Sequence, residues 1–229
     1  MKAMILAAGY GKRLLPLTAS QPKPMLEIAG KPLLQHHIEK LAAAGITDLV
    51  INTSWLAEQI EDYFGDGSEF GVTISWSRES VPLETGGGIA KALPLLGEQP
   101  FILINGDIWT DFSLSSIKNM TLTKDQLGWL LMVENPPHNP QGDFALVNGL
   151  LCCQAKPRFT FTGISLLSAQ LFNAFQAADN LAATFPLRDL LRPAIEAQRM
   201  SGAVHRGDWC DVGTPERYNQ LNAALCSLQ

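Results

Sequence analysis

The feature that most constrains the fold is a regular alternation of apolar runs and helical patterns over the first 105 residues. The apolar runs have the length of strands and cover residues 2–7, 48–52, 71–76 and 101–105. The helical patterns lie between them, at residues 32–44, 55–64 and 86–96. Continuous apolar strands that alternate with helices are typical of a parallel sheet with helices on both faces. The sequence therefore predicts an α/β fold with a Rossmann-like, mostly parallel central sheet.

The second half of the chain has a less regular pattern. Strands are expected at residues 127–133, 143–148, 150–154 and 159–167. Asn148-Gly149 indicates a tight hairpin turn between two of them. Helices are predicted over residues 168–177, 186–199 and 214–227, with Thr214 as the N-cap of the last one. Because no linker or repeat interrupts the chain, we expect residues 1–229 to form a single domain with an irregular second half.

Composition and charge exclude several classes of protein. With 46% hydrophobic and 17% charged residues, the chain is globular in composition rather than disordered. The 17 Lys and Arg residues against 22 Asp and Glu residues give a net charge of −5, which disfavours binding to nucleic acid or to a membrane surface. No apolar stretch approaches the roughly 20 residues that span a bilayer. The four cysteines lack zinc-site spacing, so we expect a cytoplasmic protein with reduced thiols.

The segment over residues 6–24 combines small residues with cations directly after the first predicted strand. Ligands of parallel α/β sheets bind beyond the carboxyl ends of the strands, where small residues let backbone N–H groups approach a phosphate. The small residues are Ala7, Ala8, Gly9 and Gly11. The cations are Lys12, Arg13 and Lys23, with no acidic residue in the segment. This pattern favours polyphosphate binding, although it matches neither common glycine fingerprint, and a solvated basic loop is the alternative.

Three glycines open the helix predicted over residues 86–96, directly after Leu83-Glu84-Thr85. Backbone amides in the first turn of a helix have no intrahelical acceptor, and glycine leaves them uncovered. A flat nucleotide base could lie against these amides, with Gly87 at their centre and Glu84 in contact with the base or the ribose. A flexible loop without a ligand is the alternative.

Two aspartates lie where a metal could bind. Asp107 follows the strand predicted at residues 101–105, at the edge of the sheet where ligands bind. Mg²⁺ is usually held by one or two carboxylates together with substrate phosphates, so Asp107 is a candidate ligand. Asp111 is the competing candidate, although it can also cap a helix. Asp211, taken by itself, is a turn residue before the helix predicted over residues 214–227.

Four motifs resemble those of the sugar-1-phosphate nucleotidyltransferases, also called nucleoside-diphosphate-sugar pyrophosphorylases. The first motif comprises Leu6-Ala7-Ala8-Gly9, Gly11-Lys12-Arg13-Leu14, Pro16-Leu17-Thr18 and Pro22-Lys23-Pro24. The others are the base-binding segment Leu83–Gly88, Gly106-Asp107, and the Trp209 to Pro215 segment with Asp211 and Gly213-Thr214-Pro215. The resemblance covers nearly the whole chain. It implies an enzyme that joins a nucleoside triphosphate to a sugar 1-phosphate and releases pyrophosphate.

The resemblance also implies roles for the charged residues of these motifs. Arg13 and Lys23 would be catalytic, because Arg13 with Lys12 would neutralise the departing pyrophosphate and Lys23 would hold the reacting phosphates together. Asp107 and Asp211 would bind the Mg²⁺ cofactor. A non-catalytic, nucleotide-sensing subunit of the same fold is the alternative. It would be expected to lose one of these charged groups, and all of them are present.

The sugar pocket is expected in the second half, where the match to the family is looser. Gly142 and Thr162-Gly163 fit two of the family's sugar-binding segments, and Asn105 is a further candidate for substrate binding. Ala155-Lys156-Pro157 stands where the family has a Glu-Lys-Pro, and so lacks the glutamate. Glu84 is a second departure, since the family often has glycine at that position.

The short chain and the glycine-rich variant at residues 84–88 resemble most the uridylyltransferases that use UTP and N-acetylmuramate 1-phosphate in peptidoglycan recycling. The lactyl carboxylate of that sugar requires a cation or backbone donors, because an unpaired buried carboxylate is costly. We nominate Arg158 first and Lys156 second, while two solvated hairpin charges are the alternative. Thymidylyl-, guanylyl- and cytidylyltransferases of the same family are the competing functions.

Overall fold

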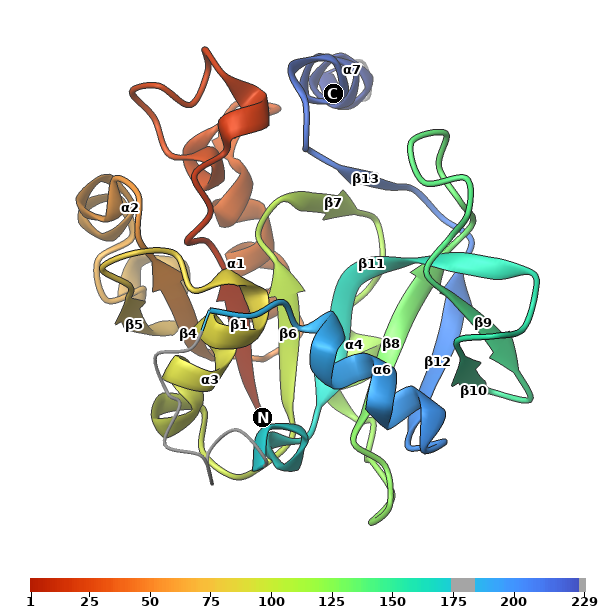
Figure 1. Ribbon diagram of the computed structural model, residues 1–229. Helices are drawn as coiled ribbons and strands as arrows, with labels where there is room; N and C mark the ends of the chain where they lie inside the picture. The colour runs from red at the N-terminus through yellow and green to blue at the C-terminus, as the bar shows by residue number, and fades with distance from the viewer. Residues whose placement is uncertain (174–183, 227–229) are drawn as a thin grey trace.

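The fold is built around one nine-stranded sheet in the computed structural model, which describes residues 1–173 and 184–226 (Figure 1). Four strands of the first half are parallel and lie in the order β5, β4, β1, β6. They span Thr73–Arg78, Asp48–Thr53, Lys2–Leu6 and Phe101–Asn105, respectively. The parallel sheet predicted for this half is confirmed, and its carboxyl ends lie along one edge.

The second half of the chain makes the sheet mixed. Its strands are β8 (Gly128–Val133), β9 (Phe144–Val147), β10 (Leu150–Cys152), β11 (Arg158–Leu167) and β12 (Met200–His205). β11 runs antiparallel to both β6 and β8, and it also pairs with β9, so that β11, β8, β12, β10 and β9 close into a small barrel. Parallel neighbours need a crossover of a dozen or more residues, whereas β9, β10 and β11 follow one another through short links. The prediction of a mostly parallel sheet is therefore wrong for this half.

Helices cover both faces of the sheet, as the apolar strands predict. One face carries α1 (Leu33–Ala43), α2 (Ala57–Phe64) and the short α4 (Ser115–Lys118). The other face carries α3 (Glu84–Leu96) and α6 (Arg188–Glu196). Successive side chains of a strand point to opposite faces, so Ile5 of β1 packs with the first group and Met4 with the second. Both strand faces are buried for this reason.

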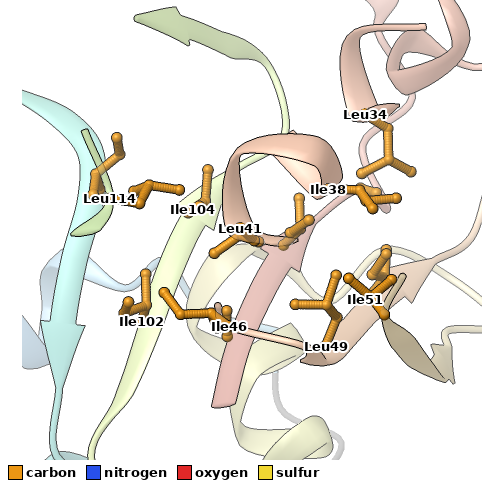
Figure 2. Packing of buried hydrophobic residues seen from close by; sticks show 14 of the residues in the cluster. Leu34, Ile38, Leu41, Ile46, Leu49, Ile51, Ile102, Ile104 and Leu114 are labelled. Atoms are coloured by element: carbon orange, nitrogen blue, oxygen red, sulfur yellow. The ribbon is translucent and has the colours of Figure 1, made fainter. Parts of the chain in front are cut away.

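In the core beneath α1, apolar residues with helical spacing pack against apolar residues with strand spacing (Figure 2). Leu34, Ile38 and Leu41 recur on one face of α1, where residues three and four positions apart lie together. They pack in one cluster with Ile102 and Ile104, alternate residues of β6. All five side chains are fully buried. Since each buried side chain of this size contributes about 1.5–3 kcal/mol, packing fixes β6, whose end carries part of the site.

The C-terminal part of the chain returns to the carboxyl edge of the sheet. β13 (Trp209–Asp211) pairs antiparallel with β7 (Ile108–Thr110), two strands that the sequence pattern did not predict. α7 (Pro215–Cys226) follows and packs near the short strand β2 (Glu27–Ile28), which pairs with β3 (Lys31–Pro32). The Arg217 N–H donates to Thr214 Oγ1 at 3.4 Å, which confirms Thr214 as the helix cap.

Four single-turn 3-10 helices complete the described structure: η1 (Lys12–Leu14), η2 (Lys23–Met25), η3 (Ser68–Phe70) and η4 (Ala169–Phe172). The helix predicted over residues 168–177 begins as η4, while residues 174–177 lie outside the described part of the chain. No helix among the described residues is long and apolar enough to cross a membrane.

Candidate functional site

A cavity of about 400 Å³ opens at the carboxyl ends of β1, β4 and β6. Its wall is formed mainly by residues 6–14, Lys23-Pro24, the turn at residues 82–85 and Asn105-Gly106-Asp107. Eight of the nine residues predicted to bind the nucleotide line this cavity: Ala7, Ala8, Gly9, Gly11, Lys12, Arg13, Lys23 and Glu84. The segments that the motifs singled out, far apart in sequence, therefore meet at one place.

The basic loop after β1 is held by a contact at Gly11. Gly11 has φ +64°, and an added Cβ would lie 2.8 Å from a methyl carbon of Thr18, so a larger residue is excluded by conformation and by space. The Thr18 hydroxyl donates to the Gly11 carbonyl at 2.9 Å. This fixed loop carries Lys12 and Arg13 to the cavity wall. Within the described chain Arg13 has no hydrogen-bond or ion-pair partner, so its charge is available to a ligand.

Lys23 and Asp107 form an ion pair in the cavity wall. The Lys23 Nζ lies 2.7 Å from Asp107 Oδ2, with the two side chains 11% and 36% exposed. Asp107 is placed by Gly106, whose N–H donates to the Leu6 carbonyl at 2.9 Å. A Cβ on Gly106 would lie 2.5 Å from that carbonyl oxygen, so only glycine lets the turn after β6 approach β1 this closely.

Asp211 reaches the same edge through the pairing of β13 with β7. Asp211 lies opposite Ile108, the neighbour of Asp107, and the Val212 N–H donates to the Asp107 carbonyl at 2.7 Å. The backbone thus brings together the two segments that carry the predicted metal ligands. The Arg217 guanidinium donates to Asp211 Oδ2 at 2.9 Å.

The other carboxylate oxygen of Asp211 suits a cation. Asp211 Oδ1 is buried and accepts no directed hydrogen bond, although His138 Nε2 approaches it to 2.9 Å. A buried acceptor without a donor is costly, and a metal ion would satisfy it. No group of three or more Cys, His, Asp or Glu among the described residues could hold a metal. Asp107 lines the cavity, whereas Asp211 does not. If both carboxylates bind one Mg²⁺, water or substrate phosphates would supply the other ligands, which is usual for this ion.

Asp111, the competing metal candidate, is engaged elsewhere. His205 Nε2 lies 2.6 Å from Asp111 Oδ1, and the Asp111 N–H donates to the Asp208 carbonyl at 3.1 Å. Asp111 does not line the cavity. The geometry therefore favours Asp107 over Asp111 as a ligand of Mg²⁺.

A buried polar chain that the motifs did not reveal links the two sides of the cavity. The Ala7 N–H donates to Asn52 Oδ1 at 2.8 Å, and Asn52 Nδ2 donates to Glu79 Oε1 at 2.7 Å. The Leu83 N–H donates to Glu79 Oε2 at 2.8 Å. Glu79 is only 5% exposed and lines the cavity with Asn52. The position of both residues at strand ends is the one signal that could have indicated them.

The glycines at the start of α3 have a different role from the one predicted. The Gly86 and Gly87 N–H groups donate to the Phe185 carbonyl at 2.9 and 3.2 Å, so they are not free to contact a base. Gly87 does not line the cavity. A Cβ on Gly88 would lie 2.7 Å from Glu79 Oε1. The prediction of uncovered amides is wrong here, because these glycines provide room for close packing.

Two of the residues predicted to bind the sugar lie together. Asn105 lines the cavity, and Gly163 lies directly beneath its side chain. A Cβ on Gly163 would be 2.7 Å from Asn105 Nδ2, and Gly163 has φ +86°. The Thr162 hydroxyl is buried and donates to the Leu131 carbonyl at 2.8 Å, so this side chain belongs to the core of the barrel.

The remaining sugar candidates lie outside this cavity. Gly142, with φ +61°, lies in the loop between β8 and β9, where an added Cβ would be 2.6 Å from Asn135 Oδ1. The Arg158 guanidinium donates to the Cys153 carbonyl. Neither Arg158 nor Lys156 lines the cavity, so the structure does not bring these cations to the nucleotide site.

His37 supports the turn that carries Asp107. Its side chain is buried beneath that turn and contacts the Ile108 backbone, while Nε2 has no partner among the described residues. Desolvation, with smaller contributions from Lys40 and His36, lowers the pKa of His37 to about 3. His37 is therefore neutral near pH 7 and acts as a packed core residue.

Known proteins share both the sequence and the fold of this chain. The nucleotidyl transferase family model matches residues 2–148. The N-acetylmuramate alpha-1-phosphate uridylyltransferase of Neisseria meningitidis is 44% identical over 232 aligned residues, which cover 97% of each chain. The mannose-1-phosphate guanylyltransferase of Mycobacterium tuberculosis is 43% identical over 115 residues, half of this chain and 32% of that one.

A solved structure shows the same fold over the full length. The glucose-1-phosphate thymidylyltransferase of Bacillus anthracis, in complex with a sucrose, superposes with a TM-score of 0.85 at 21% identity and covers 100% of this chain and 96% of its own. The family match, the near full-length relative and the placement of the motif residues around one cavity lead to the same conclusion. The chain belongs to the nucleotidyl transferase family, as the resemblance predicts.

Proposed function

We propose that this protein transfers UMP from UTP to N-acetylmuramate 1-phosphate, releasing pyrophosphate, in the recycling of peptidoglycan. The observation that carries this proposal is the 44% identity to the N. meningitidis uridylyltransferase across 97% of both chains. The cavity contributes what any nucleotidyl transfer needs, namely cations beside carboxylates at the carboxyl edge of the sheet.

In the proposed reaction a phosphate oxygen of the sugar attacks the α-phosphorus of UTP in line, and the bond to pyrophosphate breaks. The attacking oxygen is already anionic, so the protein need not supply a strong general base. The difficulty lies in bringing two polyanions together in the right orientation. Arg13, which has no partner within the described residues, would neutralise the leaving pyrophosphate with help from Lys12. Lys23, already in the cavity wall, would hold the reacting phosphates.

Asp107 and Asp211 would hold Mg²⁺, which when bound neutralises phosphate charge. The unsatisfied, buried Asp211 Oδ1 supports this role. Lys23 and Arg217, the ion-pair partners of the two aspartates, would keep each carboxylate oriented. Arg13 would therefore act on the substrates alone, whereas Lys23 would contact both the reacting phosphates and the metal-binding carboxylate of Asp107.

Glu79 supports a preference among the bases. A carboxylate has about four acceptor sites and no donor, and among the described residues two side-chain or backbone donors, from Asn52 and Leu83, reach the Glu79 carboxylate. A base that offers an N–H at its pairing edge, such as uracil at N3, could donate to this carboxylate. Cytosine presents an acceptor at N3, so in the same position it would place a lone pair against this carboxylate and could donate only from its 4-amino group. We therefore expect UTP to be preferred over CTP.

Arg158 remains the proposed partner of the lactyl carboxylate. Its Nε is buried without a hydrogen-bond partner, so one donor of the guanidinium is still unused. To serve the sugar, the side chain would have to leave the Cys153 carbonyl. This proposal predicts that Arg158→Ala lowers kcat/KM for N-acetylmuramate 1-phosphate and leaves N-acetylglucosamine 1-phosphate, which lacks the lactyl group, unaffected.

The decisive experiment measures pyrophosphate release with Mg²⁺ for each of UTP, dTTP, GTP and CTP against several sugar 1-phosphates. The expected result is a preference for UTP with N-acetylmuramate 1-phosphate over UTP with N-acetylglucosamine 1-phosphate. Equal use of the two sugars would refute the muramate assignment. The half-length match to a mannose-1-phosphate guanylyltransferase makes GTP with mannose 1-phosphate the pair to compare. No release with any pair would favour the non-catalytic alternative.

A further inference from the structure

The loop between β8 and β9 extends to the second predicted metal ligand. This loop, residues 134–143, is called the arch. It leaves the carboxyl end of β8 and returns into β9 (Figure 1). Near its middle lies His138, whose Nε2 is 2.9 Å from Asp211 Oδ1. The arch also carries Gly142, a predicted sugar-binding residue. One loop therefore touches the predicted metal site and carries part of the predicted sugar site.

The arch is fastened to β11 by side chains. Asn135 Nδ2 donates to the Arg158 carbonyl at 3.0 Å, and the Thr160 hydroxyl donates to Asn135 Oδ1 at 2.9 Å. Asn139 Nδ2 donates to Thr160 Oγ1 at 3.1 Å. These contacts lie on both sides of His138 in the sequence. These contacts therefore anchor the arch on both sides, and His138 lies on the tip between the two anchors.

The two carboxylate oxygens of Asp211 have different contacts. Arg217 holds Oδ2, and it can do so because Gly213 has no side chain: a Cβ there would lie 2.2 Å from the guanidinium. Oδ1 faces His138 without a directed hydrogen bond. Although Oδ1 itself is buried, the His138 side chain is 36% exposed, so the imidazole has room to move away from this oxygen. Oδ1 is therefore the oxygen that a cation would take.

We propose that His138 is a positioning residue that holds Asp211 Oδ1 until a divalent cation takes that oxygen, and that cation binding thereby frees the tip of the arch. A metal at about 2.0–2.1 Å from Oδ1 would need the space that the imidazole Nε2 occupies at 2.9 Å, so the two compete for one oxygen. Release of His138 would then couple metal loading to the loop that carries Gly142. The proposal rests on the proposed function only through Asp211 as a metal ligand.

The first test measures binding of Mn²⁺ alone, by the electron paramagnetic resonance signal of the free ion, with no nucleotide or sugar present. Because a partly exposed polar side-chain contact contributes little, we expect His138→Ala to bind Mn²⁺ roughly two- to fivefold more tightly than the wild type. The matched control is His205→Ala, which removes a His–Asp contact from Asp111, the aspartate that the structure disfavours as a metal ligand, and should leave Mn²⁺ affinity unchanged. Asp211→Asn should weaken binding strongly.

The second test follows amide hydrogen exchange in the arch with and without Mg²⁺. In the wild type, Mg²⁺ should speed exchange around His138, whereas in His138→Ala exchange should be fast and independent of Mg²⁺. Unchanged or weaker Mn²⁺ binding by His138→Ala would overturn the proposal, as would equal binding by Asp211→Asn and the wild type. Neither test uses a substrate, so a different sugar or base would refute the proposed function and leave this inference standing.

Discussion

Replacing Glu79 by glutamine tests the buried polar chain that joins the two sides of the cavity. Asn52 cannot turn its amide without losing the bond from the Ala7 N–H to Oδ1, so its Nδ2 must face Glu79. The Leu83 N–H faces the other carboxylate oxygen. Glutamine supplies only one oxygen. Its NH₂ group must therefore meet a second donor, from either Asn52 or Leu83.

The expected cost follows from burial. A buried donor left without an acceptor costs about 1–3 kcal/mol, and Glu79 is only 5% exposed, so water does not readily relieve the clash. For a chain of 150–250 residues each kcal/mol lowers the melting temperature by roughly 2–4 °C. Glu79→Gln should therefore lower the Tm by roughly 2–12 °C, although the two side chains are nearly the same size.

Differential scanning calorimetry of two variants separates this effect from a general response to lost charge. The control is Glu84→Gln, since Glu84 also lines the cavity but has an exposed side chain. A surface change of this kind usually alters stability by less than about 0.5 kcal/mol. If both variants melt at the wild-type temperature, or fall by the same amount, the reasoning about the buried chain is refuted.

Three further predictions follow from the cavity and its supports. Arg13→Ala and Lys23→Ala should each lower kcat on the order of 10²–10³-fold; steady-state kinetics showing only a raised KM would contradict this. Gly163→Ala should cost about 1–2 kcal/mol for its left-handed backbone alone, displace Asn105, and raise the KM for the sugar 1-phosphate in the same assay. The pKa of His37 is about 3 in the folded state and 6.5 in the unfolded state. Between these two pH values the unfolded state therefore binds more protons than the folded state. The free energy of unfolding should fall as the pH drops through 6.5 towards 3. Urea denaturation at pH 7 and pH 5 should show this loss, and His37→Leu should reduce it; an identical pH dependence in the variant would argue against it.

The first half of the fold could be predicted because its signals are local. The helix expected over residues 32–44 is α1, Leu33–Ala43, since its apolar face and its start and stop residues lie within one stretch of sequence. The hairpin was predicted for the same reason: Asn148 and Gly149 have φ values of +51° and +80°, which a tight primed turn requires. Where a residue type alone determines the conformation, the sequence pattern is sufficient.

Pairing between distant strands could not be predicted. β12 (Met200–His205) contains Ser201 and Gly202 and is mostly half-buried, so it gives no continuous apolar run. It becomes a strand because β8 offers a parallel partner, and that contact spans about a third of the chain. The closure of the barrel by β9 and β11 is likewise a tertiary contact. Asn52 and Glu79 were missed for the same reason, since each looks ordinary until the other is placed beside it.

The same limit applies to the charged residues that the motifs identified. The motif predicts the same kind of role, phosphate binding, for Arg13 and Lys23. In the structure, however, Lys23 pairs with Asp107 at 2.7 Å, and Arg13 has no partner within the described residues. Removing Lys23 leaves a carboxylate without its cation, and removing Arg13 leaves no group unpaired. The two alanine variants should therefore resemble each other in turnover, where both act on phosphates, and differ in stability, where only Lys23 has a protein partner. A motif can indicate which residues meet the substrate, but the contacts they make without substrate depend on the fold.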